Sequence, residues 1–330
     1  MASTGAGSWG EERVPSLDIS TQLGDVPGEG ERASGWRFTS WPECAEASLT
    51  WVGVRRAIFK SDLLERIRVE RLGEDGQRPS RLAAKWVTED GEIVRDRPGR
   101  GLLRISRDDA ARLMEWEAQR WAQANGRAAA KSRRYFVRNA LSYMWVLTLA
   151  TGQFERQVVM GQVSEFARRL RSGLGGPAFP YWYSPELHPG GHGWHVNFFV
   201  AQRLEHRMME SVWGLGWVWV TDFVRSPKEP KGEPLGLCRA PREGWRRASN
   251  YGCKYAQKDW SAEHVGRDNH RYEVAQGFSP TKEGSWVGDG AEAERLVDEL
   301  LTPEGREHLR VWDSNDQAGW NRPPAKTWRW

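Results

Sequence analysis

The stretch Pro185-Glu-Leu-His-Pro-Gly-Gly-His-Gly-Trp-His-Val-Asn-Phe-Phe-Val200 places polar side chains at alternating positions in an otherwise apolar segment. The Pro-Gly-Gly-His-Gly run supplies turn residues, so the stretch predicts two strands joined as a hairpin. Side chains alternate between the two faces of a strand, so Glu186 and His188 share one face, and His195 and Asn197 share one face of the returning strand. We expect the hairpin to bring these groups together on a sheet whose other face is buried.

Carboxylate, imidazole and amide oxygen together form a ligand set for a hard cation. This set suits Mg²⁺ or Mn²⁺, whereas a zinc site would more often contain cysteine or a third well-placed histidine. We therefore expect His195 and Asn197 to bind the metal. The third ligand is Glu186 or His188, and Glu186 is favoured because a carboxylate helps to neutralise the cation. A strand histidine is more often an ordinary hydrogen-bonded residue, so the metal hypothesis depends on a second motif.

That motif is Asn250-Tyr-Gly-Cys-Lys-Tyr-Ala-Gln-Lys258, which spaces two tyrosines and two lysines four residues apart. On a helix, Tyr251 and Tyr255 would lie on one face one turn apart, and so would Lys254 and Lys258. A phenol with a pKa of about 10 is a poor nucleophile, so an attacking tyrosine needs a cation that polarises its target. The lysines add positive charge for a phosphate.

Together these motifs resemble those of the rolling-circle replication initiators, the two-tyrosine branch of the HUH endonuclease superfamily. Tyr143-Met-Trp-Val-Leu-Thr-Leu149 is similar to the first motif of that family, the hairpin to the second, and the two-tyrosine segment to the third. The segment His270 to Phe278 resembles one that follows the tyrosines in relatives from high-GC bacteria. The resemblance covers about residues 134–280, and such proteins are carried by plasmids, phages and integrative elements.

Two departures from the family pattern concern the metal ligands. The second family motif is usually His-hydrophobe-His, and Asn197 stands at the second histidine. An asparagine carbonyl is a weaker donor than imidazole, although it still coordinates a hard cation. The turn is also one residue longer than the common spacing, which leaves the choice between Glu186 and His188 open.

The resemblance implies metal-assisted nicking of single-stranded origin DNA by tyrosine. The enzyme would form a 5′-phosphotyrosyl intermediate, release a 3′-hydroxyl primer for replication and later rejoin the strands. The resemblance also implies a DNA polymerase as a partner, and a separate host helicase is expected because the chain contains no Gly-x-x-x-x-Gly-Lys-Ser/Thr loop. The alternatives are a transposase or relaxase of a mobile element, or a catalytically inactive DNA-binding regulator in which Asn197 has replaced a ligand.

The order strand, helix, strand, strand, helix, strand between residues 143 and 221 predicts an α+β fold. We expect a central antiparallel sheet with helices on one face, the split βαβ arrangement that the resemblance also implies. Composition and pattern divide the chain into four parts. These are a disordered tail (1–35), an accessory α+β region with a basic helix (36–133), the endonuclease domain (134–280), and a C-terminal helix and tail (281–330).

Basic residues suggest where nucleic acid binds. The net charge is +4, which is compatible with a polyanionic partner. The run from Arg127 to Arg138 contains no acid and precedes the first-motif strand, and the stretch from Val224 to Ser249, expected to be a loop, is rich in Pro, Lys and Arg. The predicted contacts are Arg133, Arg134, Arg138, Arg246 and Arg247.

The remaining composition favours a cytoplasmic protein without a membrane partner. No apolar run approaches the length that crosses a bilayer, and the first residues lack the pattern of a signal peptide. The three cysteines show no Cys-x-x-Cys spacing, so neither a disulfide framework nor a zinc knuckle is indicated.

Overall fold

A computed structural model describes residues 35–52, 85–96, 102–188, 190–225, 238, 241–257, 272–318 and 324–330. The chain divides into two compact units, one of residues 54–130 and one of residues 1–53 with 131–330. The tail expected over residues 1–35 lies outside the described residues except for Gly35. Lys258 and His270 also lie outside them.

The unit of residues 54–130 contains three short strands, β3 (Lys85–Thr88), β4 (Ile93–Asp96) and β5 (Leu102–Ile105). Strand β3 pairs antiparallel with β4 and parallel with β5. The long helix α2 (Arg107–Arg138) begins here and ends in the other unit. Ser106 caps the start of this helix, because its hydroxyl accepts a hydrogen bond from the Asp109 amide at 3.1 Å.

The central sheet of the larger unit has the order β10-β7-β8-β6-β9, and all its pairings are antiparallel. Its strands are β6 (Tyr143–Leu147), β7 (Tyr181–Leu187), β8 (Trp194–Val200), β9 (Val218–Asp222) and β10 (Glu273–Val274). The predicted hairpin is β7 with β8, and the first-motif strand is β6. The expected α+β class with an antiparallel central sheet is confirmed.

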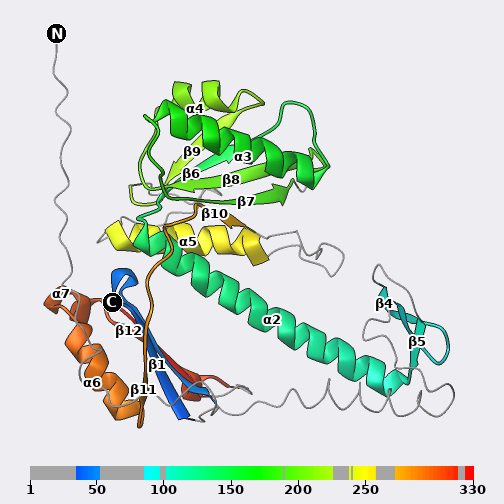
Figure 1. Ribbon diagram of the computed structural model, residues 1–330, viewed down its shortest axis with the longest axis vertical. Helices are drawn as coiled ribbons and strands as arrows, with labels where there is room; N and C mark the ends of the chain where they lie inside the picture. Colours follow the sequence, from blue (N-terminus) through cyan, green and yellow to red (C-terminus); the bar gives the residue numbers. More distant parts are fainter. Residues whose placement is uncertain are drawn as a thin grey trace. The chain divides into compact units, whose positions relative to one another are not determined.

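Helices cover both faces of this sheet rather than one (Figure 1). Helices α3 (Arg156–Gly173) and α4 (His206–Trp213) pack on one face, in a core with Phe198. Helix α5 (Pro241–Gln257) and the end of α2 pack on the other, in a core with Phe199. Phe198 and Phe199 are both 0% exposed. Adjacent buried residues on one strand require cover on both sides, which explains why the one-face expectation was wrong.

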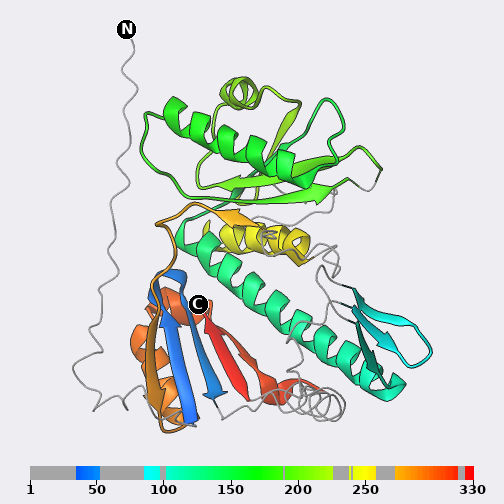
Figure 2. The same ribbon diagram turned by 45° about the vertical axis from the view of Figure 1, so that its right-hand side comes forward.

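A second sheet of the same unit has the order β11-β1-β2-β13-β12 (Figure 2). Its strands are β1 (Gly35–Trp41), β2 (Glu46–Val52), β11 (Glu283–Val287), β12 (Arg310–Asp313) and β13 (Ala325–Arg329). The same part of the unit contains the helices α6 (Gly290–Leu300) and α7 (Pro303–Glu307) and the short 3₁₀ helices η2 (Pro42–Cys44) and η4 (Ser314–Asp316). The core contains Phe38, Leu49, Leu296 and Trp328.

This sheet corrects the expected domain boundaries. Residues 36–52 were assigned to an accessory region and residues 281–330 to a separate end, but their strands pair directly, β1 with β11 and β2 with β13. Each strand pattern fixes which side chains are buried and leaves the pairing partner open, so the local sequence could not reveal the shared sheet.

The buried carboxylate of Glu46 holds this sheet to the end of α2. It meets three guanidinium groups, those of Arg133 at 3.5 Å, Arg134 at 2.9 Å and Arg329 at 3.3 Å. The side chain of Glu46 is only 4% exposed. Burial lowers the pKa of Arg134 and of Arg329, with Glu46 acting in the opposite direction. We refer to these four residues as the Glu46 cluster.

Helix α5 begins at Pro241, within the stretch that was expected to be a basic loop. Proline at the first position and Glu243 in the first turn are typical of a helix start. Arg246 and Arg247 are therefore helical. Among the helices that the structure describes, none is both long and apolar enough to cross a membrane.

Candidate metal and tyrosine site

The β7–β8 hairpin brings three of the predicted ligands into contact. Glu186 lies directly opposite His195, and Ser184 lies opposite Asn197. Glu186 Oε2 is 3.2 Å from His195 Nε2 and accepts a hydrogen bond from Asn197 Nδ2 at 3.3 Å. The side chains of Glu186 and His195 are 10% and 15% exposed, and Asn197 is 2% exposed. The predicted meeting of carboxylate, imidazole and amide is therefore present, and its members are largely shielded from water.

The fourth predicted ligand, His188, lies just beyond β7 in the turn. Its ring centroid is 5.9 Å from that of His195 and 4.9 Å from that of His192. The Gly190 amide donates a hydrogen bond to His188 Nδ1 at 3.0 Å, which occupies that nitrogen. His188 is thus next to the Glu186 contacts and more exposed than they are.

These residues fit a hard cation in donor type. His195 Nε2 faces Glu186, so it is the ring nitrogen placed to bind a cation together with that carboxylate, whereas His195 Nδ1 is buried and has no hydrogen-bond partner in the described part of the chain. Among the described residues no three His, Cys, Asp or Glu side chains form a metal cluster, because the third donor here is the amide of Asn197. Asn197 presents Nδ2 to Glu186, so its amide would have to turn over to offer its oxygen to a metal.

Two glycines bring the loop after β6 against the site. Gly193 has φ +83°, and a Cβ there would lie 2.6 Å from the backbone of Gln153. At Gly216 a Cβ would lie 2.3 Å from the Thr148 carbonyl oxygen. Any other residue at either position would push the loop away, so these glycines fix it between the hairpin turn and the start of β9.

The tyrosine helix α5 packs on the same sheet face as the ligands. Along β8, Phe199 belongs to the core under α5, and the alternation places Asn197 and His195 on that face. Tyr251 packs against this core, with its ring centroid 5.5 Å from that of Phe223. At Gly252 a Cβ would lie 3.3 Å from the ring of Trp182, so the residue beside Tyr251 is where α5 approaches the sheet closely.

The other members of the tyrosine motif are only partly described. Tyr255 lies on α5, but its side chain is outside the described residues, as is Lys258. Lys254 is exposed on the last turn of the helix. Tyr251 is therefore the one tyrosine of the pair whose side chain the structure places.

The arginines predicted to bind DNA all make contacts within the protein. Arg133 and Arg134 belong to the Glu46 cluster. Arg138 pairs with Glu43 and Arg247 with Glu243, each at 2.7 Å, and Arg246 donates to the Trp330 carbonyl oxygen at 2.7 Å. Burial and neighbouring arginines lower the pKa of Arg246 to about 10. DNA contact by these residues stays a prediction.

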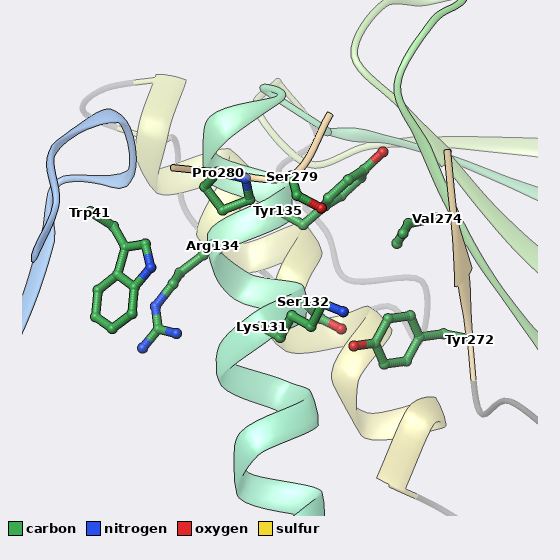
Figure 3. A pocket seen from close by; sticks show the side chains of 9 residues that line it. All are labelled: Trp41, Lys131, Ser132, Arg134, Tyr135, Tyr272, Val274, Ser279 and Pro280. Atoms are coloured by element: carbon green, nitrogen blue, oxygen red, sulfur yellow. The ribbon is translucent and has the colours of Figure 1, made fainter. Parts of the chain in front are cut away.

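A small cavity of about 110 Å³ lies elsewhere in this unit and shares no residue with the site (Figure 3). Tyr272, Tyr135 and Trp41 line it, and the Arg134 guanidinium lies 3.3 Å from the centre of the Trp41 ring. Ligand pockets usually measure about 300 to 1,000 Å³, so this space is a packing gap rather than a substrate site.

Sequence reasoning missed two tryptophans on the ligand face of the sheet. Trp217 and Trp219 are 69% and 55% exposed, and Trp219 lies opposite Val146, which in turn lies opposite Asn197. The alternation Gly216-Trp-Val-Trp-Val-Thr221 predicts a strand, but it does not tell on which face of the sheet the tryptophans lie.

Comparison of the chain with family models, with curated proteins and with solved structures gave no match.

Proposed function

We propose that the chain is a DNA endonuclease and strand transferase of the rolling-circle type. It would nick single-stranded origin DNA through Tyr251 or Tyr255, become joined to the 5′ phosphate and release a 3′ hydroxyl that primes replication. The observation that carries this proposal is the convergence of Glu186, His195 and Asn197 on the sheet face against which Tyr251 packs.

The chemistry assigns a separate task to each group. Glu186, His195 and Asn197 would hold Mg²⁺ or Mn²⁺, which when bound polarises the scissile phosphate. The tyrosine oxygen attacks phosphorus, the bond from phosphorus to the 3′ oxygen breaks, and the proton lost by the phenol is balanced by the one that the 3′ hydroxyl gains. Lys254 and Lys258 would bind phosphate oxygens or offset charge on the leaving oxygen.

A second tyrosine has a physical purpose in this scheme. The phosphotyrosyl ester retains the energy of the broken phosphodiester, so the released 3′ hydroxyl can attack it and rejoin the strand. Two tyrosines one helical turn apart allow a second cleavage while the first ester persists. Unwinding and synthesis would be left to a host helicase and a DNA polymerase, and the carrier would be a plasmid or another mobile element.

The test uses labelled single-stranded DNA from the gene's own locus, with Mn²⁺ or with EDTA. We expect Mn²⁺-dependent cleavage that leaves a polymerase-extendable 3′ end and a protein-blocked 5′ end. The double variant Tyr251→Phe/Tyr255→Phe should lose cleavage. The matched control is Tyr272→Phe, a tyrosine that stacks on Trp182 at the same core, and it should retain cleavage. Undiminished cleavage in EDTA, or a free 5′ phosphate, would contradict the proposal.

A further inference from the structure

Trp217 and Trp219 are far more exposed to solvent than large aromatic side chains that pack in a core. Three other tryptophans of this sheet and its helices, Trp145, Trp182 and Trp213, are 0% exposed, whereas Trp217 and Trp219 are 69% and 55% exposed. Single exposed apolar residues are common on protein surfaces. Trp219 lies on β9 and Trp217 directly precedes the strand, and two large rings two residues apart are different, because they form a continuous aromatic surface on one face.

The register places this surface beside the candidate metal site. Val218 and Val220 point into the core under α3 and α4, so Trp217 and Trp219 occupy the opposite face, which is that of Asn197. Trp219, Val146 and Asn197 lie in one cross-strand row on β9, β6 and β8. Adjacent strands are about 4.8 Å apart, which puts Trp219 about 10 Å from the Asn197 row position.

The backbone that carries these rings is fixed. Thr148 N donates to the Trp217 carbonyl oxygen at 2.9 Å, and Trp217 N donates to Thr148 Oγ1 at 3.0 Å. Gly216 permits the close approach to Thr148 described above. These hydrogen bonds fix the backbone at the entry to β9, so little backbone freedom of the protein would be lost when a ligand binds to the two rings.

We propose that Trp217 and Trp219 form a stacking platform for unpaired bases of the DNA strand that enters the site. This inference rests on the proposed function for the identity of the ligand. Bases stack on aromatic side chains irrespective of sequence, and proteins that bind single strands combine such rings with cations for the backbone. Exposed cations lie at the end of β9 and on α5, at Arg225 and Lys254. Strand β9 is an edge of the sheet, so a flexible strand can reach the rings from outside.

The test measures the affinity of the full chain for labelled oligodeoxythymidylate in EDTA, by fluorescence anisotropy. Trp217→Ala and Trp219→Ala should each weaken binding about tenfold, and the double variant by about 50-fold or more. Trp219→Phe should retain most of the affinity and Trp219→Leu should not, because leucine keeps apolar area without an aromatic face. Trp51→Ala removes another exposed tryptophan, which lies on the other sheet (39% exposed), and serves as the control that should not change binding.

The outcomes separate this inference from the proposed function. Tryptophan-dependent DNA binding without metal-dependent cleavage would support the platform and reject the nuclease. Cleavage and DNA affinity that do not change in the double variant would support the nuclease and reject the platform. An edge strand can also pair with a second copy of the chain. A dimer in sedimentation that dissociates in the double variant, with DNA affinity unchanged, would overturn the platform in favour of self-association.

Discussion

Two shielded glutamates of the larger unit have contrasting surroundings. Glu46 meets three guanidinium groups within 3.5 Å, and its side chain is 4% exposed. Glu186 contacts the imidazole of His195 and the amide of Asn197, and its side chain is 10% exposed. Guanidinium groups are permanently charged and bind no metal, whereas imidazole and amide can change partners and bind a cation.

The difference indicates a structural role for one carboxylate and a chemical role for the other. Glu46 joins segments that are far apart in the sequence, since Arg133 and Arg134 lie near the end of α2 and Arg329 lies on β13. Glu186 joins two neighbouring strands that the hairpin already holds together. The same substitution at the two positions should therefore fail in different ways.

The largest expected effect on stability is that of Glu46→Gln. It leaves three partly buried guanidinium groups without their carboxylate, and breaking a buried ion pair costs about 3 to 5 kcal/mol. Urea unfolding should show this loss in the free energy of unfolding. Glu165→Gln removes an exposed ion pair with Arg168 and should change the free energy of unfolding far less. Equal losses in the two variants would contradict the structural role of Glu46.

Glu186→Gln should have the opposite effect, a small change in stability and a large loss of cleavage. Glutamine preserves the shape and can still accept from Asn197, so the free energy of unfolding should change by about 1 kcal/mol or less. Cleavage should slow by on the order of 10²-fold, because a charged ligand is lost. Single-turnover rates with Mn²⁺ measure this. A large loss of stability with unchanged cleavage per folded molecule would put Glu186 in the same class as Glu46.

The surroundings of Glu46 also predict how the stability of the protein changes at alkaline pH, through the neighbouring Cys44 thiol. Burial, with the charge of Glu46 acting in the same direction, raises the pKa of the Cys44 thiol from 9.0 to about 12. The stability linked to a raised acid pKa is complete below the unfolded value and decreases as pH rises towards the folded one. Unfolding should therefore become easier above pH 9, by about 2 to 3 kcal/mol at pH 11. The slope of stability against pH should flatten in Cys44→Ala. An unchanged slope would show that ionisation of the Cys44 thiol does not contribute to the pH dependence of stability.

Asn197→His has the smallest expected effect. Imidazole is the stronger donor, so Mn²⁺ affinity should be kept or improved, by about tenfold or less. Isothermal titration measures the affinity, and Glu186→Gln serves as the reference for a weakened site. Weaker binding in Asn197→His would count against Asn197 as a ligand.

The sequence predicted local features well because their signals are local. Alternation around the turn placed Glu186 opposite the His195 strand, and four-residue spacing placed the tyrosines on a helix. The start of α5 was missed although Pro241 and Glu243 are typical of a helix start. The cover on both sheet faces was also legible, since Phe198 and Phe199 are adjacent and apolar.

The second sheet and the Glu46 cluster could not be predicted in the same way. Strands β1 and β11 lie more than two hundred residues apart and pair only after the chain folds. Nothing in the sequence near Glu46 identifies Arg329 as its partner. The side of the sheet that Trp217 occupies likewise depends on which face of β9 is covered by α3 and α4.

The most direct test of the account is the position of the covalent DNA adduct. The chain would be incubated with single-stranded DNA from its own locus and Mn²⁺, digested with a protease and nuclease, and analysed by mass spectrometry. The account predicts a nucleotide on Tyr251 or Tyr255, and its loss in the Tyr251→Phe/Tyr255→Phe variant. A nucleotide on any other residue, or an adduct that persists in that variant, would contradict it.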